Sequence, residues 1–342
     1  MRTICLWLVL TVGWSCNEAP PDRLPTTYAA LQGETMGTTY NVTYRSDRSS
    51  VDKAEFDSLL VAINAEVSTY EPESTISRFN RSASATFDTE GAVHFLENYM
   101  AARQVFTASG GTFDPTIAPL VNYWGFGYTP KRPVLRVDSV RVDSLLQLVG
   151  FDRMSLDQTT IRRDRPEMQL DFSAIAKGYG VDQLGLYLED RGIVNYLVEI
   201  GGEVRARGVN KSGQAWRIGI NVPAEDAALT DFDNVVLLRG QSMATSGNYR
   251  NYYEVDGSKY SHTINPRSGF PERSRLLSTS IVAERCMYAD AYATACMVMG
   301  TERALAFIES LDGIEGYFIS ADEQGAFTAS QTSNFPVANP PN

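Results

Sequence analysis

Short predicted helices and strands alternate along the whole chain, and this alternation limits the possible folds more than any other feature. Apolar residues recur at helical spacing after Asp52 and again from Val93 to Met100, whereas bulky and polar residues alternate from Tyr40 to Tyr44. Asp256-Gly257 predicts a hairpin turn between two short strands. Such mixing favours an α+β fold over a doubly wound parallel sheet.

Length and charge narrow the class of protein further. A chain of 342 residues that is 43% hydrophobic can bury one large core or two modest cores. The formal net charge of −11 argues against a function dominated by nucleic-acid binding, because phosphate neutralisation requires a basic surface. A diphosphate ligand would therefore need a local lysine or a metal ion.

The first 16 residues are typical of a secretory signal. Arg2 precedes an apolar run over residues 4–12, which is too short to span a bilayer as a mature helix. Residues 12–16 resemble a bacterial lipoprotein signal, so Cys16 is a candidate for lipidation; an ordinary cleaved signal is the alternative. Prolines make residues 17–30 a predicted tether. The folded domain is expected at residues 31–335, with a tail at 336–342.

The stretch from Asp171 to Asp182 predicts a loop of small residues that enters a helix. A helix N-terminus offers unpaired N–H groups and a partial positive charge, and Lys177 would add a full charge, so this is a candidate phosphate site. The sequence here matches neither the Walker loop nor the dinucleotide fingerprint. The stretch alone leaves open a helix start whose lysine faces solvent.

Two later segments carry groups suited to catalysis and metal binding. His262 lies near a turn-forming Asn-Pro pair and is either a general base or a structural turn residue. Asp290 and Thr294 lie at i and i+4 on a nearly apolar predicted helix, so their hard oxygen atoms converge, as magnesium prefers. The alternative is an acid that only stabilises the helix N-terminus.

The cysteines and histidines argue against two other kinds of site. Cys286 and Cys296 would lie roughly 15 Å apart on the same predicted helix, too far for a disulfide. His94 and His262 are the only histidines, so a zinc cluster of the usual ligand spacing cannot be built.

Three further segments are predicted as loops, and a hairpin is expected around residues 161–170. Tyr70 lies in a polar loop over residues 68–80, where it can stack on a flat ligand, although an aromatic beside a helix end is more often part of the core. Residues 112–127 are aromatic and glycine-rich, which is typical of a binding loop. Residues 244–249 are small and rich in hydroxyl groups.

In combination, these segments resemble the FAD:protein FMN transferase family, the ApbE-type flavin transferases, from about Gly33 to Phe335. So many matches in one order are far more specific than any single motif. The matching segments are Met36-Gly37-Thr38, Ser68-Thr69-Tyr70, Ile76-Ser77-Arg78-Phe79-Asn80, Phe113-Asp114-Pro115-Thr116, residues 171–182, Gly201-Gly202-Glu203, Thr245-Ser246-Gly247, His262 with Asn265-Pro266, and residues 289–294.

The resemblance implies an ApbE-like α+β fold with a mainly antiparallel sheet and FAD bound in a cleft between two lobes. It implies magnesium-dependent transfer of the FMN half of FAD to a Thr or Ser hydroxyl of a partner protein, with AMP released and His262 as the catalytic base. Magnesium would be held by the side chains of Asp290 and Thr294 and by the carbonyls of Ala174 and Ala293. The implied FAD contacts are Met36, Tyr70, Thr112, Phe113, Asp114, Asp171, Lys177 and Ile264.

The resemblance also implies a location and a class of partner. Members face the periplasm, are anchored to a bacterial membrane by an N-terminal lipid, and modify subunits of membrane-bound redox complexes. Two alternatives remain at this stage: a magnesium-dependent FAD pyrophosphatase that yields FMN and AMP, and a non-catalytic FAD-binding lipoprotein. Three positions depart from some relatives, since Ala174 replaces threonine, Ala293 replaces aspartate, and Asn265 replaces an aspartate that would orient His262.

Overall fold

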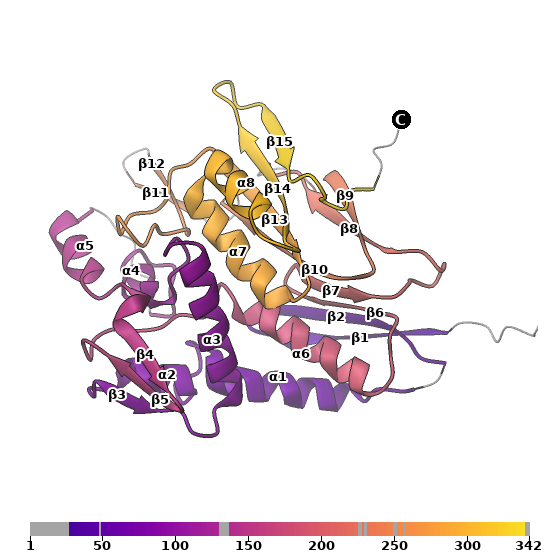
Figure 1. The fold of residues 1–342 in the computed structure, drawn as a ribbon, viewed down its shortest axis with the longest axis horizontal. Coiled ribbons are helices and arrows are strands. Elements are labelled where there is room, and N and C mark those ends of the chain that lie inside the picture. Colours follow the sequence, from indigo (N-terminus) through magenta and orange to yellow (C-terminus); the bar gives the residue numbers. More distant parts are fainter. Residues whose placement is uncertain are drawn as a thin grey trace, which may run out of the picture.

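An eight-stranded antiparallel sheet forms the centre of the protein (Figure 1). The computed structural model describes residues 27–47, 49–129, 137–224, 228, 231–248, 252–255 and 258–338. The hairpin β1–β2 and the meander β13–β14–β15 form the two ends of the sheet. The strands, in spatial order, are β1 (Tyr28–Thr35), β2 (Thr38–Arg45), β6 (Tyr196–Ile200), β7 (Glu203–Arg207), β10 (Gly240–Gly247), β13 (Leu276–Ala283), β14 (Glu315–Ala321) and β15 (Phe327–Gln331).

Helices cover one face of this sheet, with α6 and α7 packed side by side upon it (Figure 1). The predicted helix after Asp52 is confirmed, because the Asp52 side chain accepts a hydrogen bond from the amide of Ala54 and caps α1. The helices are α1 (Lys53–Val67), α2 (Thr75–Arg81), α3 (Val93–Ala108), α4 (Ala118–Tyr123), α5 (Ser139–Leu146), α6 (Ala176–Asp190), α7 (Cys286–Met299) and α8 (Thr301–Glu309).

Three smaller strand groups and two 3-10 turns complete the architecture. The hairpin predicted on either side of residues 256–257 is confirmed by its paired strands, although its turn lies outside the described residues. These elements are the sheet β3 (Thr86–Asp88), β5 (Thr160–Arg163) and β4 (Met154–Asp157), the pair β8 (Trp216–Asn221) and β9 (Phe232–Leu238), the pair β11 (Tyr252–Val255) and β12 (Ser258–Ser261), and the 3-10 turns Pro115–Ile117 and Phe151–Arg153.

Alternation along the strands builds a core on each face of the sheet. Ile281 and Phe318 point into the large core beneath the helices, whereas their neighbours Val282 and Ile319 point into a second core with Trp216 of β8. This pattern follows from the two-residue period of a strand. The predicted α+β fold with a mainly antiparallel sheet is therefore confirmed, and both faces of the central strands are buried.

Four predicted local structures are wrong. The polar loop at residues 68–80 contains α2, which Ser74 caps by accepting from the amide of Ser77. The segment 112–127 contains α4. Residues 244–247 belong to β10, where Ala244 is fully buried in the core beneath the helices. In each case tertiary packing stabilises an element that is too short, or too rich in small residues, for its sequence pattern to predict.

The fourth error is the position of a hairpin. It joins β4 to β5 and turns at Gln158, whose φ of 53° lies in the left-handed region, so residues 164–170 follow the hairpin. Because Gln is an uncommon residue at such a φ, the turn carries no sequence signal. In addition, β1 begins at Tyr28, so ordered structure starts inside the predicted tether of residues 17–30.

Cys286 and Cys296 are both buried and unpaired, as their expected separation required. Among the described residues, no helix has the length and apolar character needed to cross a membrane.

Candidate functional site

The stretch 171–182 and the helix of Asp290 meet at the centre of the molecule. The loop closes on itself, because Asp171 Oδ1 accepts from the amide of Ser173 at 2.7 Å. The chain then enters α6, where the amide of Gly178 donates to Asp290 Oδ2 of α7 at 3.1 Å. Two segments that lie 112 residues apart thus form adjoining walls of one site.

Three charged side chains define the electrostatics of this site. Lys177 forms an ion pair with Glu203, which enters from the first residue of β7. Burial opposes the charge on Lys177, but the carboxylates of Asp290 and Glu203 outweigh it and raise its pKa. Burial raises the pKa of Asp290, although Lys177 and the Gly178 amide act in the opposite direction.

Glu203 is the site residue that sequence reasoning missed. It is 3% exposed, and burial raises its pKa to about 7 despite its pairing with Lys177. Its Oε2 atom is buried without a hydrogen-bond partner among the described residues. The motif Gly201-Gly202-Glu203 was visible, but only the fold shows that Glu203 faces Lys177 across a distance of 26 residues in sequence.

A cavity of about 410 Å³ opens between these walls. Its remaining walls come from the Thr112–Ile117 region, β10, and the segment after β12. The structure therefore gathers segments from across the whole domain around one space. The predicted site residues that line it are Tyr70, Thr112, Phe113, Asp114, Asp171, Ala174, Lys177, His262, Ile264, Asp290 and Thr294.

A second cavity of about 570 Å³ adjoins the first. Both are lined by Tyr70, Ser173 and Lys177, so the two form neighbouring compartments. Met36 lines only the second compartment and occupies the β1–β2 turn with a φ of 50°. Ala293 lines neither compartment among the described residues, because it is fully buried within α7. Its carbonyl stays a predicted metal ligand.

The side chain of Tyr70 is 68% exposed, so the alternative that it belongs to the core is wrong. It lines both compartments, as Lys177 does. Partial desolvation by the surrounding walls raises the pKa of Tyr70, and the charge of Asp171 adds to the effect. An exposed ring in this position can stack on a flat ligand.

His262 lines the first compartment and contacts the ring of Phe126 edge-on, with 6.3 Å between centroids. Its possible orienting residue, Asn265, has other partners: its side-chain amide donates to Glu272 at 2.9 Å, and its oxygen accepts from the amide of Arg267 at 2.9 Å. Asn265 therefore organises the turn that carries His262.

Asp114 lines the cavity and also ties its wall to a neighbouring segment. Burial raises its pKa to about 6, while hydrogen bonds from Thr116 and from the Phe151 amide favour its ionised form. These contacts tie the Thr112–Asp114 turn to the 3-10 turn at Phe151. The carboxylate thus acts mainly on the shape of the wall.

The oxygen donors of the site suit magnesium better than a softer metal. No group of three or more His, Cys, Asp or Glu side chains able to hold a metal occurs in the described ranges. However, the carboxylate of Asp290 and the hydroxyls of Thr294 and Ser246, 3.4 Å from each other, line the same compartment. Magnesium commonly takes one or two carboxylates and completes its shell with water and substrate phosphates. The residues present therefore fit that ion.

Comparison with known proteins places this geometry in a family. A curated FAD:protein FMN transferase from Vibrio cholerae is 39% identical over 293 residues, covering 84% of this chain and 86% of the relative. One from Haemophilus influenzae is 35% identical over 313 residues, covering 89% of this chain and 90% of the relative.

Solved structures agree with the sequence relatives. The flavin transferase ApbE from Vibrio cholerae has a TM-score of 0.83 and 36% identity, covering 91% of this chain and 99% of the other. The apo form of the flavinyl transferase ApbE from Pseudomonas stutzeri has a TM-score of 0.81 and 35% identity, covering 91% and 96%. The ApbE family matches residues 36–318. On this evidence, the chain belongs to the ApbE family.

Proposed function

We propose that the protein is an FAD:protein FMN transferase that moves the FMN half of FAD onto a Thr or Ser hydroxyl of an acceptor protein. The observation that carries this proposal is the convergence of Lys177, Asp290 and His262 on one cavity in a protein of net charge −11. Such a cavity offers a positive group for a diphosphate, a carboxylate for a cation, and a base. Retention of FAD alone requires no base.

The reaction exchanges one phosphorus–oxygen bond for another. The acceptor hydroxyl oxygen forms a bond to the FMN phosphorus, the bond from that phosphorus to the bridging oxygen breaks, and AMP leaves with the electron pair. His262 takes the hydroxyl proton, and Lys177 stabilises charge on the diphosphate. Transfer of this kind depends mainly on positioning and charge stabilisation.

Magnesium fits this scheme through the side chains of Asp290 and Thr294, with the carbonyl of Ala174, a residue that lines the same compartment, as a further ligand. When bound, the ion would neutralise negative charge on the diphosphate. The remaining contacts hold the substrate: Tyr70 stacks against a ring of FAD, and Met36 extends the site into the second compartment. FAD thus occupies both compartments in this proposal.

We also infer that the enzyme faces the periplasm and is anchored to a bacterial membrane by an N-terminal lipid. The signal-like residues 1–16, the candidate lipid acceptor Cys16 and the following prolines support this location. An anchored enzyme would meet acceptors that are themselves membrane-bound, which suits subunits of redox complexes. Labelling with a fatty-acid analogue, compared between wild type and Cys16→Ala, tests the anchor.

One experiment separates the candidate activities. The protein is incubated with FAD, magnesium and a candidate acceptor, and the acceptor is analysed by mass spectrometry. Covalent FMN on Thr or Ser, with AMP released, supports the transferase. Free FMN without an adduct would identify an FAD pyrophosphatase, and unchanged FAD would identify a binding protein.

A further inference from the structure

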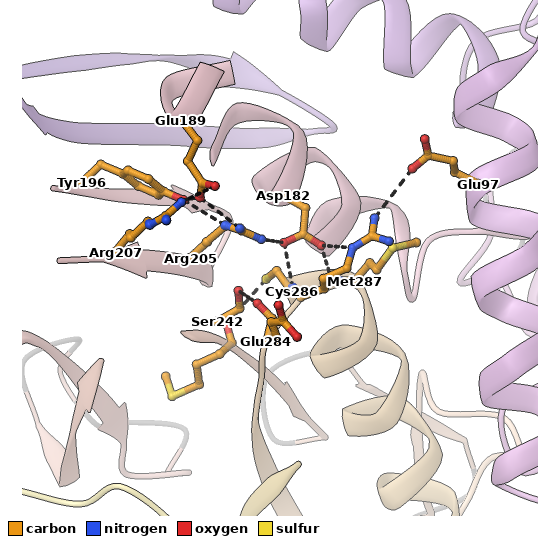
Figure 2. A network of polar contacts seen from close by, with 12 residues as sticks. Glu97, Asp182, Glu189, Tyr196, Arg205, Arg207, Ser242, Glu284, Cys286 and Met287 are labelled. Carbon is orange, nitrogen blue, oxygen red and sulfur yellow. Dashed lines mark hydrogen bonds and ion pairs between the residues drawn. The ribbon is translucent and has the colours of Figure 1, made fainter. Parts of the chain in front are cut away.

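Asp182 links α6 and α7, the two helices that form the site. Among the described residues that line the two cavities, Asp182 is absent. Its side chain is fully buried on α6. Oδ1 accepts from the amide of Cys286 at 2.9 Å, and Oδ2 accepts from the amide of Met287 at 3.1 Å (Figure 2). One carboxylate therefore binds two amides in the first turn of α7.

These two bonds replace a cap that α7 lacks. The residue at its N-cap position, Arg285, makes no side-chain capping bond, and the first turn contains no acid. The first amides of a helix have no partner within the helix, and its N-terminus carries a partial positive charge. A carboxylate supplied by another helix satisfies both requirements. The start of α7 is thus held by α6.

Two arginines, one on the sheet and one at the start of α7, hold the Asp182 carboxylate. Arg205 of β7 donates to Asp182 Oδ1 at 2.9 Å and to Glu189 at 3.1 Å (Figure 2). Arg285 approaches Asp182 Oδ2 at 3.7 Å and Glu97 of α3 at 3.7 Å. The carboxylate consequently has partners on β7, on α7 and at the residue before α7, and a rotation of its side chain would break several contacts.

The positions along the helices connect this link to the site. Asp182 lies about one turn after Gly178, and Cys286 and Met287 lie about one turn before Asp290. We propose that Asp182 is a positioning residue: it sets α7 against α6 so that Asp290 and Lys177 face the same diphosphate and cation. This inference rests on the proposed function, because it assigns those two residues to the ligand.

The test compares Asp182→Asn with Glu189→Gln. Asparagine preserves shape but removes the charge and one acceptor. Glu189 is a matched control, because it shares Arg205 with Asp182 and also contacts Tyr196 and Arg207, all outside α7. Both variants weaken the same network, so both lower the melting temperature. Only Asp182→Asn is expected to raise the dissociation constant for Mg²⁺, measured by calorimetry with FAD present, by about tenfold or more, as for other residues that orient metal ligands.

Turnover provides the second readout. In Asp182→Asn, saturating Mg²⁺ should recover much of the lost FAD turnover, since the catalytic groups are intact. An unchanged magnesium affinity in Asp182→Asn, or an equal loss in Glu189→Gln, would overturn the positioning role. If the wild-type enzyme turns over FAD without magnesium, the proposed metal site is wrong, whatever the role of Asp182. Hydrogen exchange of the α7 amides then tests that role separately.

Hydrogen exchange reports on the link without any ligand. The amides of Cys286 and Met287 should exchange faster in Asp182→Asn than in Glu189→Gln, and equal rates in the two variants contradict the inference. If Asp182→Asn does not fold, hydrogen exchange is measured on the wild type with and without ligand. Addition of FAD with Mg²⁺ should slow exchange in the first turn of α7, and unchanged exchange there would refute coupling between that turn and the site.

Discussion

The amide of Gly178 on α6 donates a hydrogen bond of 3.1 Å to the carboxylate of Asp290 on α7. The helices are so close here that a Cβ atom on residue 178 would lie 2.5 Å from the carbonyl oxygen of Cys286. Glycine at this position therefore serves packing, and the same close approach brings a buried acid to Lys177. This contact therefore serves both the packing of α6 on α7 and the geometry of the site.

Gly178→Ala should lower the free energy of unfolding by about 1–3 kcal/mol, because the methyl group collides with backbone that cannot move freely. Helix propensity alone predicts a gain of about 1 kcal/mol from the same change. Denaturant unfolding of the variant shows whether the steric loss or the propensity gain is larger. Gly240→Ala is the control, since nothing lies within 4 Å of the added atom, and its effect should stay within about 0.5 kcal/mol. A stabilised Gly178→Ala protein would contradict the packing argument.

His262→Ala should bind FAD but transfer FMN about 10²- to 10⁴-fold more slowly, because the base that accepts the hydroxyl proton is lost. FAD binding is followed by fluorescence and transfer by mass spectrometry. His94→Ala is the control, since His94 contacts Tyr179 at 2.8 Å outside the cavity lining. Wild-type transfer by His262→Ala would remove His262 from the mechanism.

Asp290→Ala should abolish magnesium-dependent activity, since the only predicted carboxylate ligand is removed. Activity is measured across a magnesium titration with EDTA-treated protein. Asp190→Ala, an exposed change at the end of α6, should behave as the wild type. If Asp290→Ala works normally with and without added metal, the metal assignment is wrong.

Glu203→Gln should change how stability varies with pH in metal-free protein. The folded pKa of Glu203, about 7, exceeds its ordinary value of 4.5, so the folded state binds its proton more tightly than the unfolded state. The resulting stabilisation is complete below pH 4.5 and disappears as the pH rises through 7. Melting temperatures from pH 4.5 to 8 should therefore fall less in Glu203→Gln than in the wild type. Parallel curves would show that Glu203 does not titrate in this range.

Tyr70→Ala should weaken FAD binding about tenfold, which corresponds to about 1.4 kcal/mol and is within the range for an aromatic contact. Tyr70→Phe is the matched variant, because it keeps the ring and removes only the hydroxyl. Dissociation constants from flavin fluorescence should be near the wild-type value for Tyr70→Phe. Equal weakening in both variants would assign the effect to the hydroxyl instead of the ring.

Local sequence patterns predicted the elements whose stability is largely local. Apolar residues at helical spacing identified α1 and α3, and the capping residue Asp52 marked the start of α1. The Glu55 side chain in the first turn of α1 contacts Tyr187 of α6 and Arg191 at the end of that helix, which no local pattern predicts. The i, i+4 spacing placed Asp290 and Thr294 on one cavity wall because helix geometry alone determines that placement.

By itself the sequence determined the α+β character and the family resemblance. It also predicted thirteen site residues, of which twelve line one of the two cavities around Lys177, the exception being Ala293. Only the tertiary structure identified Glu203 and Asp182 as partners of the site. Burial decides the roles of these two acids, since a buried charge needs a partner wherever the fold supplies one. Their partners lie 26 and 104 residues away, beyond the reach of any local pattern.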